Sequence, residues 1–198
     1  DFSARVRDES GERKTLDHMF PSANTAIPQM VVETGMLTQG QADEAIAAHA
    51  KFNEGVMRVD IFGVRQDGID GEFQGPIEGA VPVLEPGKRY LIETVIRTKK
   101  MGHIFTQGTA DSNEVWMDVI AKSGDRIIGR SGGMEDDSRW VDPYAHFVNA
   151  FVLDREGNRI SRRNAEDIFT VLYSNQIPPG AADVVHYELD VPDDLTEP

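Results

Sequence analysis

From residue 56 onward, the chain alternates between short apolar segments and turns, and this pattern restricts it to a β-rich fold. Side chains that switch between apolar and polar at every second position are typical of a strand with one buried face. We expect strands in the following segments: VMRVDIFGVR (56–65), RYLIETVIR (89–97), EVWMDVIAK (114–122), RIIGRSGG (126–133), HFVNAFVLD (146–154), NRISR (158–162), FTVLYSNQI (169–177) and DVVHYELDV (183–191).

The connections between these segments indicate how the strands are joined. Turn sequences separate them, among them EPGK, SGD, REG and PPGA. Gly157, in REG, stands at a position that requires a positive φ. No helical segment alternates with the strands, which argues against a parallel sheet. The sequence therefore predicts an all-β fold, an antiparallel immunoglobulin/fibronectin-like β-sandwich.

The first 55 residues have a different pattern, which predicts an irregular, partly helical arm. Thr38 is suited to cap a helix, and Gln41, three residues later, completes a capping box. Four residues then fall on one helical face: Ala42, Ala45, Ile46 and His49. The arm has too little apolar periodicity for an independent domain.

We accordingly expect three regions: the arm at 1–55, the β-sandwich domain at 56–192 and a tail at 193–198. At 198 residues the chain is long enough to bury a core. It begins with Asp1 rather than Met, as a processed product or a piece of a longer protein would.

Composition excludes several classes of partner and cofactor. A formal charge of −14 would repel nucleic acid and anionic membrane surfaces, whereas it suits solubility, a cationic partner or divalent cations. The apolar runs are too short for membrane insertion. Because the chain has no cysteine, it can form no disulfide or thiolate metal site and can attach no haem covalently.

The sequence carries no signature of an enzyme. It lacks the Gly-x-Ser-x-Gly elbow, the His-Glu-x-x-His helix, the phosphate-binding Walker loop and the dinucleotide-binding glycine pattern. Carboxylates are plentiful, but no pair can be assigned to acid/base catalysis without geometry. We therefore expect a non-catalytic chain.

One loop and three histidines are candidates for a binding site. Asp111, Asn113 and Glu114 place oxygen ligands close together, which suits Ca²⁺, although the spacing is not that of an EF-hand. The alternative is that such side chains cap turns through bonds to the backbone.

The histidines His18, His103 and His146 each lie one or two residues before a phenylalanine. Such an imidazole is either half-buried and bonded to a carbonyl, or offered to a metal. On the second interpretation, His146 would join Asp111, Asn113 and Glu114 as a metal ligand.

The runs 84–133, 141–164 and 175–192 resemble the C-terminal β-sandwich region of periplasmic multihaem c-type cytochromes. That family has a Gly-His-x-Phe-Pro-Thr-Gly-like loop followed by a strand containing Trp. Here the loop is GHIFTQG, with Thr106 and Gln107 in place of Pro-Thr, and Trp116 follows. The segment DHMFPSANTAIP is similar to the family's His-x-Phe-x-Gly-x-Asn segment.

The resemblance, which spans residues 16–192, implies a periplasmic or extracellular accessory module that docks on an N-terminal multihaem region or on a redox partner. Haem c would belong to the parent protein, an oxidoreductase or electron-transfer protein. His18 and His103 would be offered as distal haem ligands.

A different hypothesis is a stand-alone periplasmic or extracellular binding module, stabilised by Ca²⁺, that recognises carbohydrate or protein. Trp140 and Tyr144 would then form the stacking surface. An enzyme with acid/base carboxylates ranks third.

Overall fold

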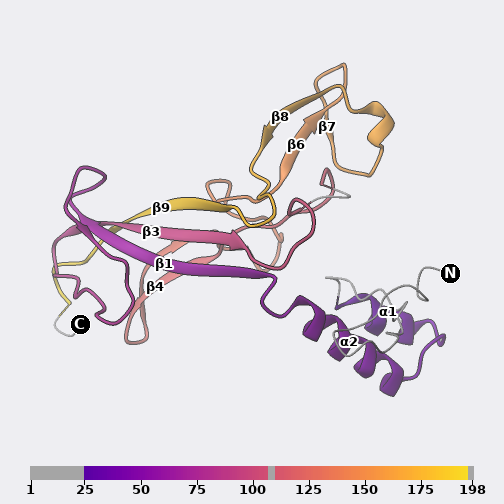
Figure 1. Cartoon of the computed structure of the whole chain (residues 1–198), viewed down its shortest axis with the longest axis horizontal. Coiled ribbons are helices and arrows are strands. Elements are labelled where there is room, and N and C mark those ends of the chain that lie inside the picture. Colours follow the sequence, from indigo (N-terminus) through magenta and orange to yellow (C-terminus); the bar gives the residue numbers. More distant parts are fainter. Residues whose placement is uncertain (1–24, 107–109, 196–198) are drawn as a thin grey trace, which may run out of the picture. The chain divides into compact units, whose positions relative to one another are not determined.

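The computed structural model of the protein describes residues 25–106 and 110–195. The chain divides into two units, a helical one that ends at Glu54 and a β-rich one that begins at Gly55 (Figure 1). Each unit is described by itself.

The helical unit contains α1 (Ile27–Glu33) and α2 (Gln39–Asn53). Pro28 lies in the first turn of α1, where a missing N–H costs no hydrogen bond. The predicted capping box of α2 is confirmed: the Thr38 side chain accepts from the backbone N–H of Gln41, and the Gln41 side chain accepts from the backbone N–H of Thr38. The predicted inner face of α2 is also confirmed, since Ala42 is buried and Ala45, Ile46 and His49 are half-buried.

The largest sheet of the β-rich unit has four antiparallel strands in the order β2-β1-β3-β9. Their bounds are β1 (Met57–Gln66), β2 (Phe73–Gln74), β3 (Arg89–Thr98) and β9 (Ala182–Asp190). β3 is the central strand, and it is paired along its whole length with β1 on one side and with β9 on the other.

A hairpin of β4 (Val119–Ser123) and β5 (Arg126–Ser131) forms the second sheet. Ala121 and Ile128 pack against a cluster made of Tyr90, Leu189 and Val191. The approach is close, because a Cβ atom on Gly129 would lie 2.8 Å from the Leu189 side chain. Glycine at this position therefore lets the hairpin lie against the main sheet.

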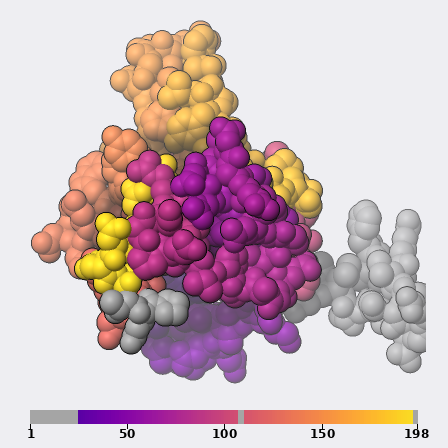
Figure 2. Space-filling model, turned by 90° about the vertical axis from the view of Figure 1, so that its left-hand side faces the viewer, coloured from indigo at the N-terminus to yellow at the C-terminus, as the bar shows by residue number. Residues whose placement is uncertain are grey.

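The third sheet has the order β7-β6-β8, with β6 (Ala150–Leu153), β7 (Arg159–Ile160) and β8 (Thr170–Ser174). A 3-10 helix, η2 (Ala165–Asp167), precedes β8. This sheet, here called the lobe (residues 150–174), stands out from the other two sheets in Figures 1 and 2. It has its own small buried cluster, made of Ala150, Val152 and Ile160.

A third buried cluster lies where the main sheet meets the segments that lead to and from the lobe. Its members are Ile96, Val148, Ile177 and Val185, with Phe105, Val115 and Met117 packed against them. Side chains from four distant parts of the chain meet here. This cluster therefore holds the long loops of the unit in place.

The expectation of a largely antiparallel β fold with short N-terminal helices is confirmed. Gly157 has the predicted positive φ, at 84°. Some strands are shorter than the pattern indicates. Trp116 forms only an isolated bridge with Phe147, and its indole N–H donates to the carbonyl of Gly132 at 3.0 Å. Loop contacts of this kind depend on residues far away in sequence.

Neither helix in the described ranges has the length and apolar character that a membrane-spanning helix needs.

The buried cluster generates a stability prediction. Ile96 is 2% exposed, so Ile96→Ala should lower the free energy of unfolding by about 2–5 kcal/mol, through lost burial and a residual cavity. Ile61, on the neighbouring strand, is 59% exposed, and Ile61→Ala should cost less than about 1 kcal/mol. Urea unfolding of both variants would test this. Equal losses would show that Ile96 is not part of the core.

Candidate functional site

The His103 loop follows β3 and is attached to the core two residues later. The N–H of Phe105 donates to the carbonyl of Ile177 at 2.9 Å, and the N–H of Ile177 donates back to the carbonyl of Phe105 at 2.7 Å. The Phe105 side chain packs on the buried cluster around Ile96. The backbone beside His103 is therefore fixed at a defined place.

The His103 side chain is exposed, and its Nδ1 atom lies 3.0 Å from the carbonyl oxygen of Ile104. A carbonyl oxygen only accepts, so in the neutral ring Nδ1 carries the hydrogen and Nε2 keeps its lone pair. Within the described residues, Nε2 of His103 has no hydrogen bond or ion pair. On this exposed residue, Nε2 is therefore the imidazole nitrogen that can accept a bond.

The other histidines of the β-rich unit have carboxylates near their Nε2 atoms. Nε2 of His146 lies 3.0 Å from the Asp183 carboxylate, although the ring N–H is not aligned on that carboxylate as a hydrogen bond. Nε2 of His186 lies 3.9 Å from Glu93. His103 differs from both because no carboxylate of the described residues faces it. His18, the other predicted haem ligand, lies outside the described residues.

Each residue of the predicted metal set has a different partner. Asp111 is buried and accepts from the backbone N–H of Arg163 at 2.7 Å. The Asn113 amide donates to the Thr106 carbonyl at 3.2 Å. Glu114 pairs with Arg159 at 3.1 Å.

The contacts of Asp111 and Glu114 connect the 110–114 loop to the lobe, whereas the contact of Asn113 stays beside the loop. Within residues 25–106 and 110–195, no three His, Asp or Glu side chains come together in a way that would hold a metal ion. The Ca²⁺ site at Asp111, Asn113, Glu114 and His146 stays a prediction.

A turn-capping role is seen at Asp142, in the loop that carries Trp140 and Tyr144. The Asp142 carboxylate accepts from the backbone N–H of Tyr144 at 2.9 Å and from that of Gly132 at 3.1 Å. These two bonds hold the pKa of Asp142 below its usual value, because they favour the charged carboxylate. The Asp-Pro-Tyr sequence was the signal for this turn.

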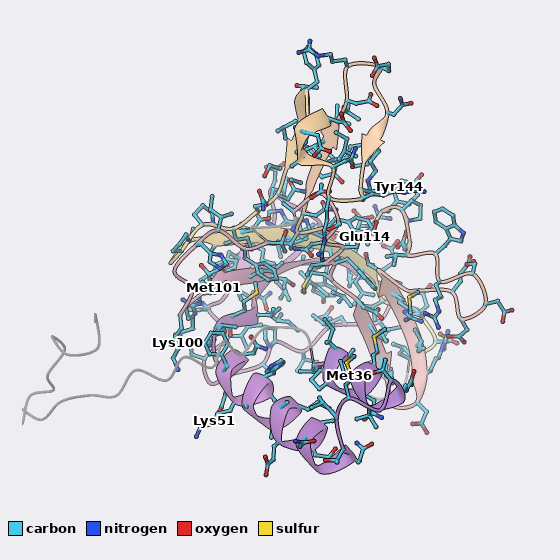
Figure 3. All side chains as sticks on the ribbon, turned by 90° about the vertical axis from the view of Figure 1, so that its right-hand side faces the viewer. Met36, Lys51, Lys100, Met101, Glu114 and Tyr144 are labelled. Atoms are coloured by element: carbon cyan, nitrogen blue, oxygen red, sulfur yellow. The ribbon has the colours of Figure 1, made fainter. Side chains whose placement is uncertain are left out.

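The same loop displays two aromatic rings to solvent. The side chains of Trp140 and Tyr144 are 75% and 91% exposed, and Tyr144 is labelled in Figure 3. Because Asp142 lies between them and fixes the backbone, the rings are carried on an ordered turn. An exposed ring on fixed backbone is suited to stacking against a planar or apolar ligand surface.

The surface cavities in the described part of the β-rich unit include two that His103 does not line. One, of about 590 Å³, is mainly apolar and is lined by side chains that include Val81, Val83, Leu84, Ile128, Val191 and Leu195. The other, of about 460 Å³, includes Glu114, Trp116 and the Asp118–Arg130 ion pair in its lining. Of the predicted site residues, Glu114 alone lines either cavity.

Comparison of the chain with protein-family models, with curated proteins and with solved structures finds no match. The description of the site therefore rests on its geometry, because these comparisons supply no related protein.

The Asp142 turn generates a pH prediction. A carboxylate whose pKa is lowered on folding stabilises the protein above the usual carboxyl pKa, and this contribution is lost as the pH falls through the lowered value. Asp142→Asn should therefore lower the melting temperature at pH 7. The gap between wild type and variant should close as the pH falls below the usual carboxyl pKa of about 3.9 and through the lowered pKa of Asp142.

The melting temperature, measured at a series of pH values, would test this. Asp137→Asn, an exposed position in the same loop, is the matched control and should follow the wild type. A gap that stays constant with pH would contradict the role of the charged Asp142.

Proposed function

We propose that this chain is a non-catalytic β-rich module of a multihaem c-type cytochrome, which docks on the haem region and offers His103 to a haem held there. The observation that carries the proposal is the exposed His103 residue, whose Nδ1 bonds to the Ile104 carbonyl and leaves the lone pair of Nε2 to accept a bond. The family resemblance of the GHIFTQG loop supplies the identity of the partner.

The chemistry of the imidazole fits this role. A histidine that binds a metal through Nε2 usually donates its other N–H to a carbonyl or carboxylate, which fixes the tautomer and the ring. His103 already has this arrangement, with Ile104 as the acceptor. Haem, when bound by the neighbouring region, would supply the electron transfer, and an added imidazole would tune its potential.

Because this chain has no cysteine, haem attached covalently in the proposed parent protein would be attached by another region. His18 would be a second donated imidazole, as the resemblance implies.

An uncovered strip on β1 supports docking. Val59 and Ile61 are 52% and 59% exposed. They lie opposite Ile96 and Thr94 of β3, and directly opposite residues of an antiparallel pair share one face of the sheet. The face that forms the core at Ile96 therefore continues to β1 without cover, as expected of a module that buries more surface against its haem region.

The contact between the β4–β5 hairpin and the main sheet supports a sandwich of the immunoglobulin/fibronectin type as the architecture of this module. A periplasmic or extracellular location follows from the proposed function, because c-type cytochromes of this family act there.

The test is made on the product of the full-length gene, produced where c-type haem is attached. A pyridine haemochrome spectrum and the intact mass should show several haems. His103→Ala should then convert one low-spin haem to high spin in the electron paramagnetic resonance spectrum, because its sixth ligand is lost. His186→Ala is the matched control and should leave the spectrum unchanged.

Full-length protein without haem would contradict the whole proposal. If haem is present but its spectrum is insensitive to His103→Ala, the ligand role is contradicted. The docking part of the proposal would then remain.

A second function, a stand-alone binding module for carbohydrate, is favoured by the exposed Trp140 and Tyr144 rings on the Asp142 turn. Sugar rings stack on such aromatic faces, and the loop needs no rearrangement to offer them.

For this second function, Trp140 fluorescence should change on titration with oligosaccharides. Trp140→Ala should weaken binding by roughly ten-fold, equivalent to about 1.4 kcal/mol. If Ca²⁺ stabilises the module, the melting temperature should rise with Ca²⁺ concentration. Phe52→Ala, another exposed aromatic residue, is the control. Unchanged fluorescence across a glycan panel would exclude this function.

A further inference from the structure

The strand β8 is an exposed apolar edge of the lobe. All five of its residues are exposed, with Val171 at 54%, Leu172 at 62% and Tyr173 at 37%. It is paired with β6 on one side and is the last strand of its sheet in the described structure. Phe169, just before it, is also 57% exposed.

An edge strand turns about half of its backbone N–H and C=O groups away from its single neighbour, where they can pair with another strand. Proteins usually protect such an edge with charged residues, proline or a bulge. The segment 168–174 has no charged residue, no proline and no glycine. Its one protection is a bulge at Leu172, opposite Phe151 and Val152.

The sequence of β8 is complementary to itself in the antiparallel sense. Its five residues are Thr-Val-Leu-Tyr-Ser. If two copies pair about Leu172, Thr170 lies opposite Ser174, and Val171 lies opposite Tyr173. Hydroxyl pairs and aromatic–β-branched pairs are among the favourable cross-strand combinations.

The charge of the lobe permits two copies of the chain to approach each other through β8. Residues 150–174 carry Arg155, Arg159, Arg162 and Arg163 against Asp154, Glu156, Glu166 and Asp167. The formal net charge of these residues is zero, so the charge of −14 comes entirely from the rest of the chain. The lobe is therefore a place where two strongly acidic chains can meet without local repulsion.

Arginines also cover two aromatic rings of the lobe. The guanidinium groups of Arg155 and Arg159 lie 4.8 Å from the ring centres of Phe169 and Phe151. Tyr173 stacks on Phe151, with ring centres 5.5 Å apart. These contacts fix the aromatic side chains beside the edge, so pairing would require little additional ordering of them.

We propose that two copies of this chain associate by antiparallel pairing of their β8 strands about Leu172, so that the two lobes form one continuous six-stranded sheet. The contact is isologous, as a two-fold axis requires. Because the paired strands are short and bulged, the dimer is weak and depends on protein concentration. The proposal does not depend on haem or on His103.

Sedimentation velocity of the 198-residue chain over a range of concentrations tests the association. The wild type should shift from the mass of the monomer, 22.0 kDa, toward twice that value. Leu172→Lys should weaken the dimer by roughly ten-fold or more, because the two-fold axis brings like charges opposite each other. Val184→Lys, at a 50% exposed strand position outside the lobe, should dimerise like the wild type.

A cross-linking experiment tests the register. Because the chain has no cysteine, Leu172→Cys supplies the single thiol of each copy. Residues opposite each other in an antiparallel pair have Cα atoms about 4.5–5.5 Å apart, within disulfide reach. Mild oxidation should therefore give covalent dimers with Leu172→Cys and far fewer with Val184→Cys.

Circular dichroism and the melting temperature would confirm that each variant is folded. A wild type that stays monomeric at all concentrations, together with no preferential cross-linking at Leu172, would overturn the proposal. A dimer that Leu172→Lys leaves intact would also overturn it, because association would then use another surface.

Discussion

The reciprocal backbone pairing of Phe105 and Ile177 is the contact on which the rest of the β-rich unit depends. It joins the loop after β3 to the segment that leads from β8 into β9, and Phe105 and Ile177 both contribute to the cluster around Ile96. Two long excursions of the chain, the His103 loop and the lobe, begin and end beside this contact. Together with the bonds from the Val148 N–H to the Val115 carbonyl and from the Asn175 N–H to the Asn149 carbonyl, it fixes the backbone near His103 and at the base of the lobe.

The unit combines a strongly acidic chain with three surfaces of different chemistry. The His103 loop offers a lone pair, and the Asp142 turn offers aromatic rings. The β8 edge offers exposed apolar side chains on a segment without charged residues. None of these requires a deep pocket, and each presents groups outward from fixed backbone. This arrangement fits the proposed docking module, in which haem chemistry would belong to the region that it docks on.

Sequence reasoning located most of the strands, although several are shorter than it predicted, and the predicted site residues stay a prediction. Alternation and turns identified the strands because both are local properties, and the capping box of α2 is local too. The surroundings of the predicted metal ligands could not be foreseen in the same way. Asp111 and Glu114 are close in sequence, yet they bond to Arg163 and Arg159, which are about 45–52 residues away. Spacing along the chain cannot show that distant arginines engage both carboxylates.

By itself, the sequence determined the antiparallel β content and the helical N-terminal segment, and it showed that the chain has no cysteine to which haem could be attached. Only the tertiary structure decided that the strands of the described residues form three sheets, that no described carboxylate pairs with Nε2 of His103, and that β8 lies at the edge of its described sheet. The physical reason is that periodicity reports which face of a strand is apolar, whereas pairing and exposure depend on which distant segments pack against that strand.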